Sequence, residues 1–115
     1  MGTDNNRECI EELSQIQQKK EQFQKELQDY KKIETEFGNN FFNDMKEIDR
    51  IKEESNSENK VLTILDECQA TLIGIKKRTD AWCEEAKKNI DRNLKQLEDE
   101  EIQLRYKQAS EGNKE

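Results

Sequence analysis

Cysteine and histidine are the side chains that most often act as nucleophiles, bases or metal ligands, and this chain uses them unevenly. It contains three cysteines, Cys9, Cys68 and Cys83, and no histidine. The cysteine spacing fits no zinc motif, and no histidine is present to complete one. We therefore interpret the three cysteines as reduced thiols that pack in or beside an apolar seam, with Cys68 in the seam and Cys83 next to it.

Carboxylates are abundant, with 27 Asp and Glu residues in 115, so acidic pairs on one helix face arise by chance. A four-carboxylate metal centre needs acids that point inward. The acids expected to do so, Glu34, Asp44 and Glu101, lie at different levels of the predicted helices. The chain has no glycine-rich phosphate loop and no nucleophile paired with a base. The sequence therefore predicts a protein that is not an enzyme and binds no metal or other cofactor.

The composition is that of a narrow helical seam and not of a broad core. Hydrophobic residues make up 30% of the chain and charged residues 41%, with no proline, whereas ordinary globular domains are roughly 45–50% apolar. A helix seam needs only about two apolar residues in seven. The net charge of −7 argues against nucleic-acid binding. Short apolar runs and a polar start predict no membrane insertion and no signal peptide, hence a cytoplasmic chain.

A heptad pattern over residues 8–54 predicts the first helix. Its apolar residues follow two registers, offset by three or four positions, that form one stripe. The predicted seam residues of this helix are Leu13, Ile16, Phe23, Leu27, Tyr30, Phe37, Phe41, Ile48 and Ile51. The stretch Gly38–Asn40 contains typical helix-ending residues, yet the stripe continues across it. This favours a kink or local fray over a turn, and leaves open whether the helix breaks.

The second helix is predicted over residues 58–108, after a polar turn at 55–58. Ser55 with Glu58 forms a capping-box pattern, and Ser57 is an alternative cap. The predicted seam residues of this helix are Leu65, Leu72, Ile75, Trp82, Ala86, Ile90, Leu94 and Leu97. Residues 1–7 and 110–115 carry no pattern and are expected to be disordered.

The two stripes match when the chain is folded at residues 56–57. Ile48 then meets Leu65, and Ile16 meets Leu97. Gly38 falls level with Gly74, where the helices could approach closely. The predicted fold is all-α, a long antiparallel two-helix hairpin over residues 8–109 that resembles a coiled coil and completes a bundle with a partner or a second copy.

Several apolar residues lie off the predicted seam and form the candidate binding site. The hypothesis is that a protein partner docks on Ile33, Phe42, Met45, Ile64 and Ile73. The alternative is that these residues widen the intrachain seam. Near the C-terminus, Leu104 and Tyr106 form a candidate targeting segment.

The stretch Leu97–Lys107, which is acidic at first and then apolar, aromatic and basic, carries a family resemblance. With the proline-free acidic hairpin around it, the chain resembles the small helical partners of LXG-domain toxins in Gram-positive type VII secretion. The resemblance implies a protein that pairs with the helical N-terminal domain of a toxin and targets it to the secretion machinery. It also implies a cytoplasmic chain that could be exported with its partner.

The chain departs from the wider type VII group at two motifs. The Trp–x–Gly turn of better-known members is replaced by Asn56–Ser57, and Tyr106 is followed four residues later by Ser110, where the export signal has Asp or Glu. We therefore expect this chain to supply a docking surface and its partner to supply the signal. The alternative function is a self-associating coiled-coil scaffold, so homodimer and heterocomplex both remain open.

Overall fold

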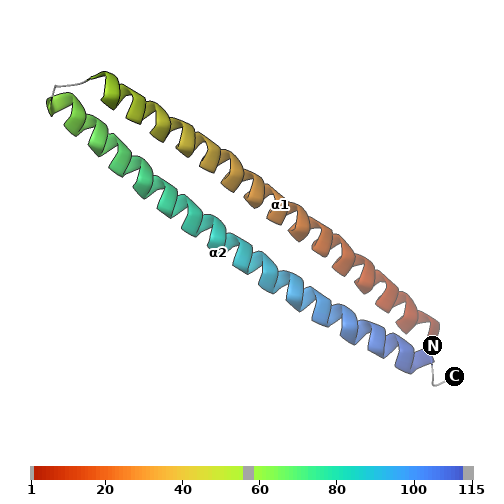
Figure 1. Ribbon diagram of the computed structural model, residues 1–115. Coiled ribbons are helices and arrows are strands. Elements are labelled where there is room, and N and C mark those ends of the chain that lie inside the picture. Colours follow the sequence, from red (N-terminus) through yellow and green to blue (C-terminus); the bar gives the residue numbers. More distant parts are fainter. Residues whose placement is uncertain (1, 56–58, 113–115) are drawn as a thin grey trace. The chain divides into compact units, whose positions relative to one another are not determined.

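The computed structural model describes the backbone of residues 2–55 and 59–112, and the side chains of 6–55 and 59–110. It contains two α-helices, α1 over Gly2–Glu54 and α2 over Asn59–Gly112 (Figure 1). The described residues include no strand. The prediction of an all-α antiparallel hairpin is confirmed.

The helices extend further than the sequence pattern predicts. α1 begins at Gly2, so residues 2–7 are helical where disorder was expected, and Gln108 of α2 donates a hydrogen bond of 3.1 Å to Asn6. α2 reaches Gly112, which places residues 110–112 in the helix. The side chains of residues 2–7 and 110–112 are mostly weak helix formers, so the sequence pattern contains no signal that the helices continue through them.

α1 passes through Gly38–Asn40 as continuous helix, so it neither breaks nor frays there. Its end is marked by Ser55, whose backbone N–H and hydroxyl both donate to the carbonyl oxygen of Ile51, at 2.9 Å and 2.8 Å. Ser55 therefore closes α1 and is not seen capping α2. Ser57 and Glu58, the other parts of the predicted caps, lie outside the described residues, as do residues 113–115.

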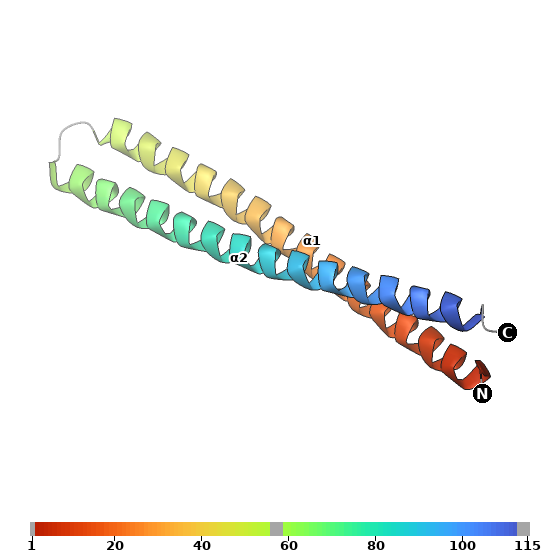
Figure 2. The ribbon, with the colours of Figure 1, turned by 90° about the horizontal axis from the view of Figure 1, so that it is seen from below.

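The chain divides into two compact units, and unit 1 comprises Met1–Gln28 with Lys87–Glu115. Here the first part of α1 and the last part of α2 lie side by side and antiparallel (Figure 2). The buried side chains of this unit are Cys9, Ile16, Ile90 and Leu97. Three of them, Ile16, Ile90 and Leu97, are residues that the sequence predicts in the seam. Lys20 of α1 also forms an ion pair of 3.0 Å with Glu101 of α2.

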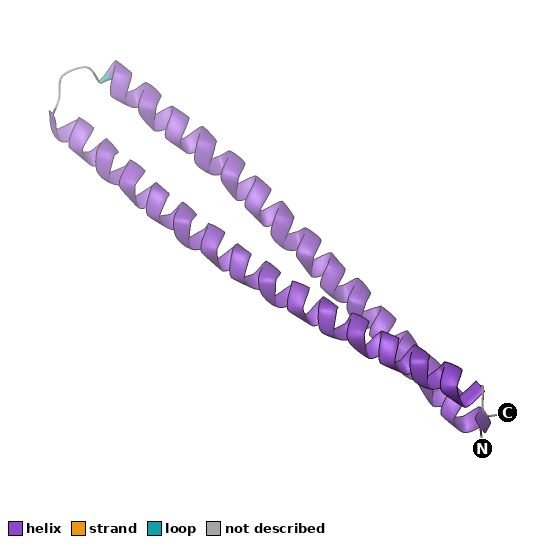
Figure 3. Cartoon of the chain, turned by 60° about the horizontal axis from the view of Figure 1, so that its bottom comes forward, coloured by secondary structure: helices purple, strands orange, loops and turns teal. Residues whose placement is uncertain are grey.

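Unit 2 comprises Asp29–Ala86 and contains the second part of α1 and the first part of α2, again antiparallel (Figure 3). Cys83 is fully buried, and seam residues such as Phe41 and Leu72 are half-buried. The Lys76 Nζ lies 5.6 Å from the centre of the Phe41 ring. The seam of unit 2 is therefore narrow and partly polar.

In unit 2, one of the two lines of residues predicted to form the α2 seam is shifted along the chain by one residue. Cys68, Ile75 and Trp82 are exposed, although Trp82 contacts Tyr30 edge-on with ring centres 5.3 Å apart. Gln69, Lys76 and Cys83, each the next residue along, are the half-buried or buried ones. The line of Leu65, Leu72 and Thr79 runs between the two sets at helical spacing, with the exposed set on one side and the half-buried or buried set on the other. α1 packs against the side that carries the half-buried or buried set.

Polar residues are tolerated in this seam because they find partners. Gln69 donates a hydrogen bond of 2.8 Å to Asp49 and accepts one from Lys52, which also pairs with Asp66. Lys76 pairs with Asp80 at 2.6 Å. The predicted close approach at Gly38 and Gly74 is wrong, since a Cβ added at either glycine would have no atom of the opposite helix within 4 Å.

Candidate helix-docking groove

Four of the five predicted partner-binding residues have exposed side chains, namely Ile33, Phe42, Ile64 and Ile73. The fifth, Met45, is half-buried. It follows Phe41 by four residues and precedes Ile48 by three, which places it on the seam line of α1. Met45 therefore belongs to the intrachain seam and not to a docking face.

The four exposed residues do not form the single face that was predicted. Ile64 and Ile73 are nine residues apart on α2, which corresponds to two and a half turns of helix. They therefore lie on opposite sides of α2. The structure separates the predicted site into two flanks of unit 2.

The more extensive apolar flank is the one that contains Ile64. Spacings of four, three, four and seven residues place Cys68, Thr71, Ile75 and Trp82 on the same side of α2, and all of these side chains are exposed. We call the set Ile64, Cys68, Ile75 and Trp82 the α2 stripe. The heptad spacing of Cys68, Ile75 and Trp82 predicted that these residues lie in the intrachain seam. This exposed surface was therefore not predicted from the sequence.

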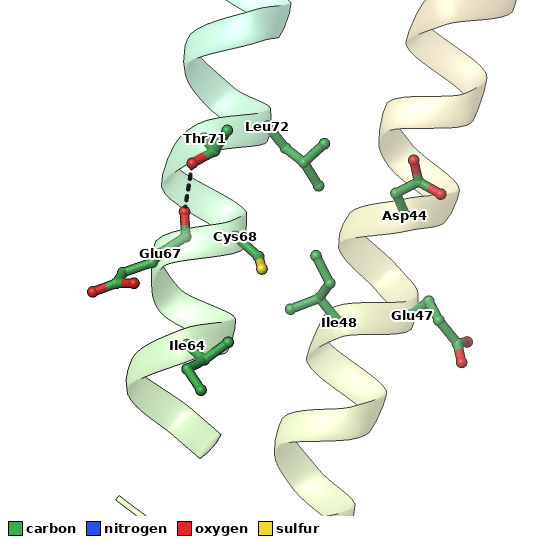
Figure 4. Close-up of a pocket in the computed structure, with 8 residues that line it drawn as sticks. All are labelled: Asp44, Glu47, Ile48, Ile64, Glu67, Cys68, Thr71 and Leu72. Carbon is green, nitrogen blue, oxygen red and sulfur yellow. Dashed lines mark hydrogen bonds between the residues drawn. The ribbon is translucent and has the colours of Figure 1, made fainter. Parts of the chain in front are cut away.

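A groove of about 620 Å³ lies between α1 and α2 at one end of the α2 stripe. It is lined by Asp44, Glu47, Ile48, Ile64, Glu67, Cys68, Thr71 and Leu72. Figure 4 shows Ile48, Cys68 and Leu72 extending toward the space between the helices. The floor is therefore apolar, and it is continuous with the exposed Ile64.

The rim of the groove is acidic. In Figure 4 the carboxylates of Glu47 and Glu67 point away from the floor on opposite sides. A hydrogen bond from Arg50 lowers the pKa of Glu47, so this carboxylate is charged at neutral pH. Asp44 and Glu67 make no ion pair within the described part of the chain. The groove thus combines an apolar floor with uncompensated negative charge at its edge.

No protein-family model, curated protein or solved structure matches this chain.

The candidate targeting segment lies in unit 1 and is divided between two environments. Leu104 is half-buried in the seam, whereas Tyr106 is exposed on the outer side of α2. A shallow hollow there is lined by Ile102, Arg105, Tyr106, Ala109 and Ser110, all from α2. One helix alone forms this hollow, whereas the groove of unit 2 lies between two helices.

The described side chains form no cluster of three or more cysteines or carboxylates that could hold a metal ion. Within the same residues, neither helix has an apolar segment of the length and hydropathy that crossing a bilayer requires. Glu34 is half-buried and Asp44 is exposed, so the three acids that the sequence placed inward are not equivalent. Glu101 forms a cross-helix ion pair with Lys20.

Proposed function

We propose that this protein is a non-catalytic binding partner that docks by helix packing onto another protein. The observation that carries the proposal is the balance of apolar side chains. Among the described residues, five apolar side chains are buried, and nine large ones are exposed. Burying apolar surface contributes about 25 cal/mol per Å², so a partner that covers the exposed set gains free energy that the two helices alone do not.

The specific form of the proposal is an adaptor for the helical domain of a toxin exported by type VII secretion. It is supported by the resemblance carried by Leu97–Lys107 and by the exposure of Ile102 and Tyr106 within that stretch. In this role the chain is made in the cytoplasm, holds the toxin's helices and directs them to the export machinery. The partner contributes the export signal.

The test is complex formation between purified proteins. The chain is mixed with the isolated helical N-terminal domain of an LXG toxin, and the mass of the product is measured by size-exclusion chromatography with light scattering. A one-to-one complex is the expected result. Two separate peaks at concentrations of about 10 µM, well above the Kd of a stable complex, would remove the adaptor role.

Self-association is the competing function, and the same instrument separates the two. A scaffold module forms a homodimer when the chain is measured alone. A monomer alone and a heterodimer with the toxin domain is the pattern that the adaptor requires. A homodimer that persists when the toxin domain is added would replace the adaptor with the scaffold.

A further inference from the structure

Resting on the proposed binding function, we propose that the groove of unit 2 receives one amphipathic helix whose apolar stripe is bordered by Lys and Arg. The occupant is thus a basic helix of a different protein and not a second copy of this chain. Three features of unit 2 carry the proposal. They are the α2 stripe, an acidic edge on α1, and the repulsion between like charges that would arise if a second copy docked on the same surface.

The α2 stripe has the geometry of a helix-binding surface. Its residues repeat at the three- and four-residue spacing that also builds the intrachain seam, so a second helix can lie along α2 in the same manner. From Ile64 to Trp82 the stripe covers 18 residues of helix, or about 27 Å at 1.5 Å per residue. An occupant of about five turns would match this length. Helix-in-groove binding uses apolar anchors at this spacing.

The opposite edge of the surface is acidic. Asp44 and Glu47 line the groove on α1. Three more acids lie on the same side of α1 as Glu47, because each is a near-whole number of turns from it. They are Asp29, Glu36 and Glu54, at separations of 18, 11 and seven residues. All five are exposed. Arg50 pairs with Glu47 and Glu54. The remaining carboxylates leave the α1 edge net negative, which a Lys- or Arg-bordered helix complements.

The α2 side carries less charge. Glu67 adds one carboxylate to the rim of the groove. This side of α2 also carries two basic residues at stripe spacing, Lys60 four residues before Ile64 and Arg78 between Ile75 and Trp82. An occupant is therefore expected to place its basic residues toward α1 and an acidic or neutral residue opposite Arg78.

A second copy of the chain fits this surface poorly. A two-fold contact places the same patch against itself. One partly desolvated interface would then hold Asp44, Glu47 and Glu67 of both copies, and of these only Glu47 has an ion-pair partner among the described residues, Arg50. Like-charge contacts of this kind are unfavourable and select against the wrong partner.

The test uses two synthetic peptides of about 18 residues, each with leucine at the a and d positions of its heptads. One has lysine at the e and g positions, and its twin has glutamate there. Binding to the full chain is measured by isothermal titration calorimetry. We expect the lysine peptide to bind about tenfold or more tightly than the glutamate twin. Its affinity should fall as salt is raised, because ions screen exposed charges.

Two variants locate the contact. Ile64→Glu places a charge on the α2 stripe, and Phe42→Glu places the same charge on the opposite flank. The two side chains are comparably exposed, at 59% and 64%, so neither substitution disturbs the seam, and circular dichroism checks this. Ile64→Glu should abolish binding of the lysine peptide, and Phe42→Glu should leave it unchanged. Equal affinity for the two peptides, no binding of either, or equal loss in both variants overturns the proposal.

The same variants separate this inference from the proposed function. If the toxin domain binds the chain and Ile64→Glu leaves that complex intact, the binding function stands and the groove assignment is wrong. If the lysine peptide binds at the groove but the toxin domain forms no complex, the groove stands and the toxin-adaptor role is wrong.

Discussion

Lys20 of α1 and Glu101 of α2 form an ion pair of 3.0 Å across the seam of unit 1, and their side chains are only 19% and 21% exposed. Arg105 holds the other carboxylate oxygen of Glu101 at 3.1 Å. The sequence marks Lys20 as an interruption of the apolar stripe. In the structure the interruption is matched by an acid at the same level, so the pair favours one alignment of the helices over a slipped one.

This pair makes stability depend on pH in the acidic range. Hydrogen bonds from Lys20 and then Arg105 lower the pKa of Glu101 in the folded chain. Because the folded pKa lies below the ordinary value of 4.5, the stabilisation is fully present above that value and is lost as the pH falls through the lowered pKa. Glu101→Gln should therefore show a smaller decrease in Tm than the wild type between pH 6 and pH 3, roughly the range over which a glutamate titrates. Parallel Tm curves would contradict this assignment.

Seam and surface residues of unit 1 should differ sharply in their contribution to stability. Leu97 is 7% exposed and Ile102 is 60% exposed. Leu97→Ala leaves a cavity and should lower the free energy of unfolding by about 2–3 kcal/mol, whereas Ile102→Ala should change it by about 0.5 kcal/mol or less. Urea titrations followed by circular dichroism measure both. Similar losses in the two variants would show that the seam is not where the structure places it.

Glycine within α1 offers a stabilising substitution. Gly38 is helical, and a Cβ added there meets no atom of the opposite helix within 4 Å. Gly38→Ala should raise the free energy of unfolding by about 0.5–1 kcal/mol, because alanine loses less backbone entropy in a helix. Gly74→Ala in α2 has the same surroundings and serves as the matched comparison. A decrease in either variant would indicate a close helix approach that the structure does not contain.

The three thiols should react at very different rates. Cys9 and Cys83 are buried and Cys68 is exposed. In native buffer an aromatic disulfide reagent is expected to modify one thiol rapidly, and the other two only at the rate of unfolding. Cys68→Ser should remove the fast phase and leave the slow ones. A fast phase that survives this substitution would mean that another cysteine is accessible.

The sequence was a good guide to the fold because the line of Leu65, Leu72, Ile90 and Leu97 is unambiguous. It was a poor guide to the second line of the α2 seam. Cys68, Ile75 and Trp82 flank the leucines on one side, and Gln69, Lys76 and Cys83 flank them on the other. Apolar character favours the first set, and the structure uses the second.

The reason for that choice lies in partners supplied by the other helix. Gln69 hydrogen-bonds to Asp49, and Lys76 lies over Phe41. These contacts depend on how α1 is aligned, and a pattern read along α2 alone contains no such information. The candidate docking surface was missed for the same reason, since residues assigned to the seam cannot also be assigned to an outer face.

Trp82 is the only tryptophan of the chain, and it stands 56% exposed at the end of the α2 stripe with Tyr30 against its edge. The protein thus carries a built-in fluorophore beside its candidate binding surface. Removing water from the indole would shift its emission toward the blue, so occupancy of this surface can be followed by light alone, without attaching a dye.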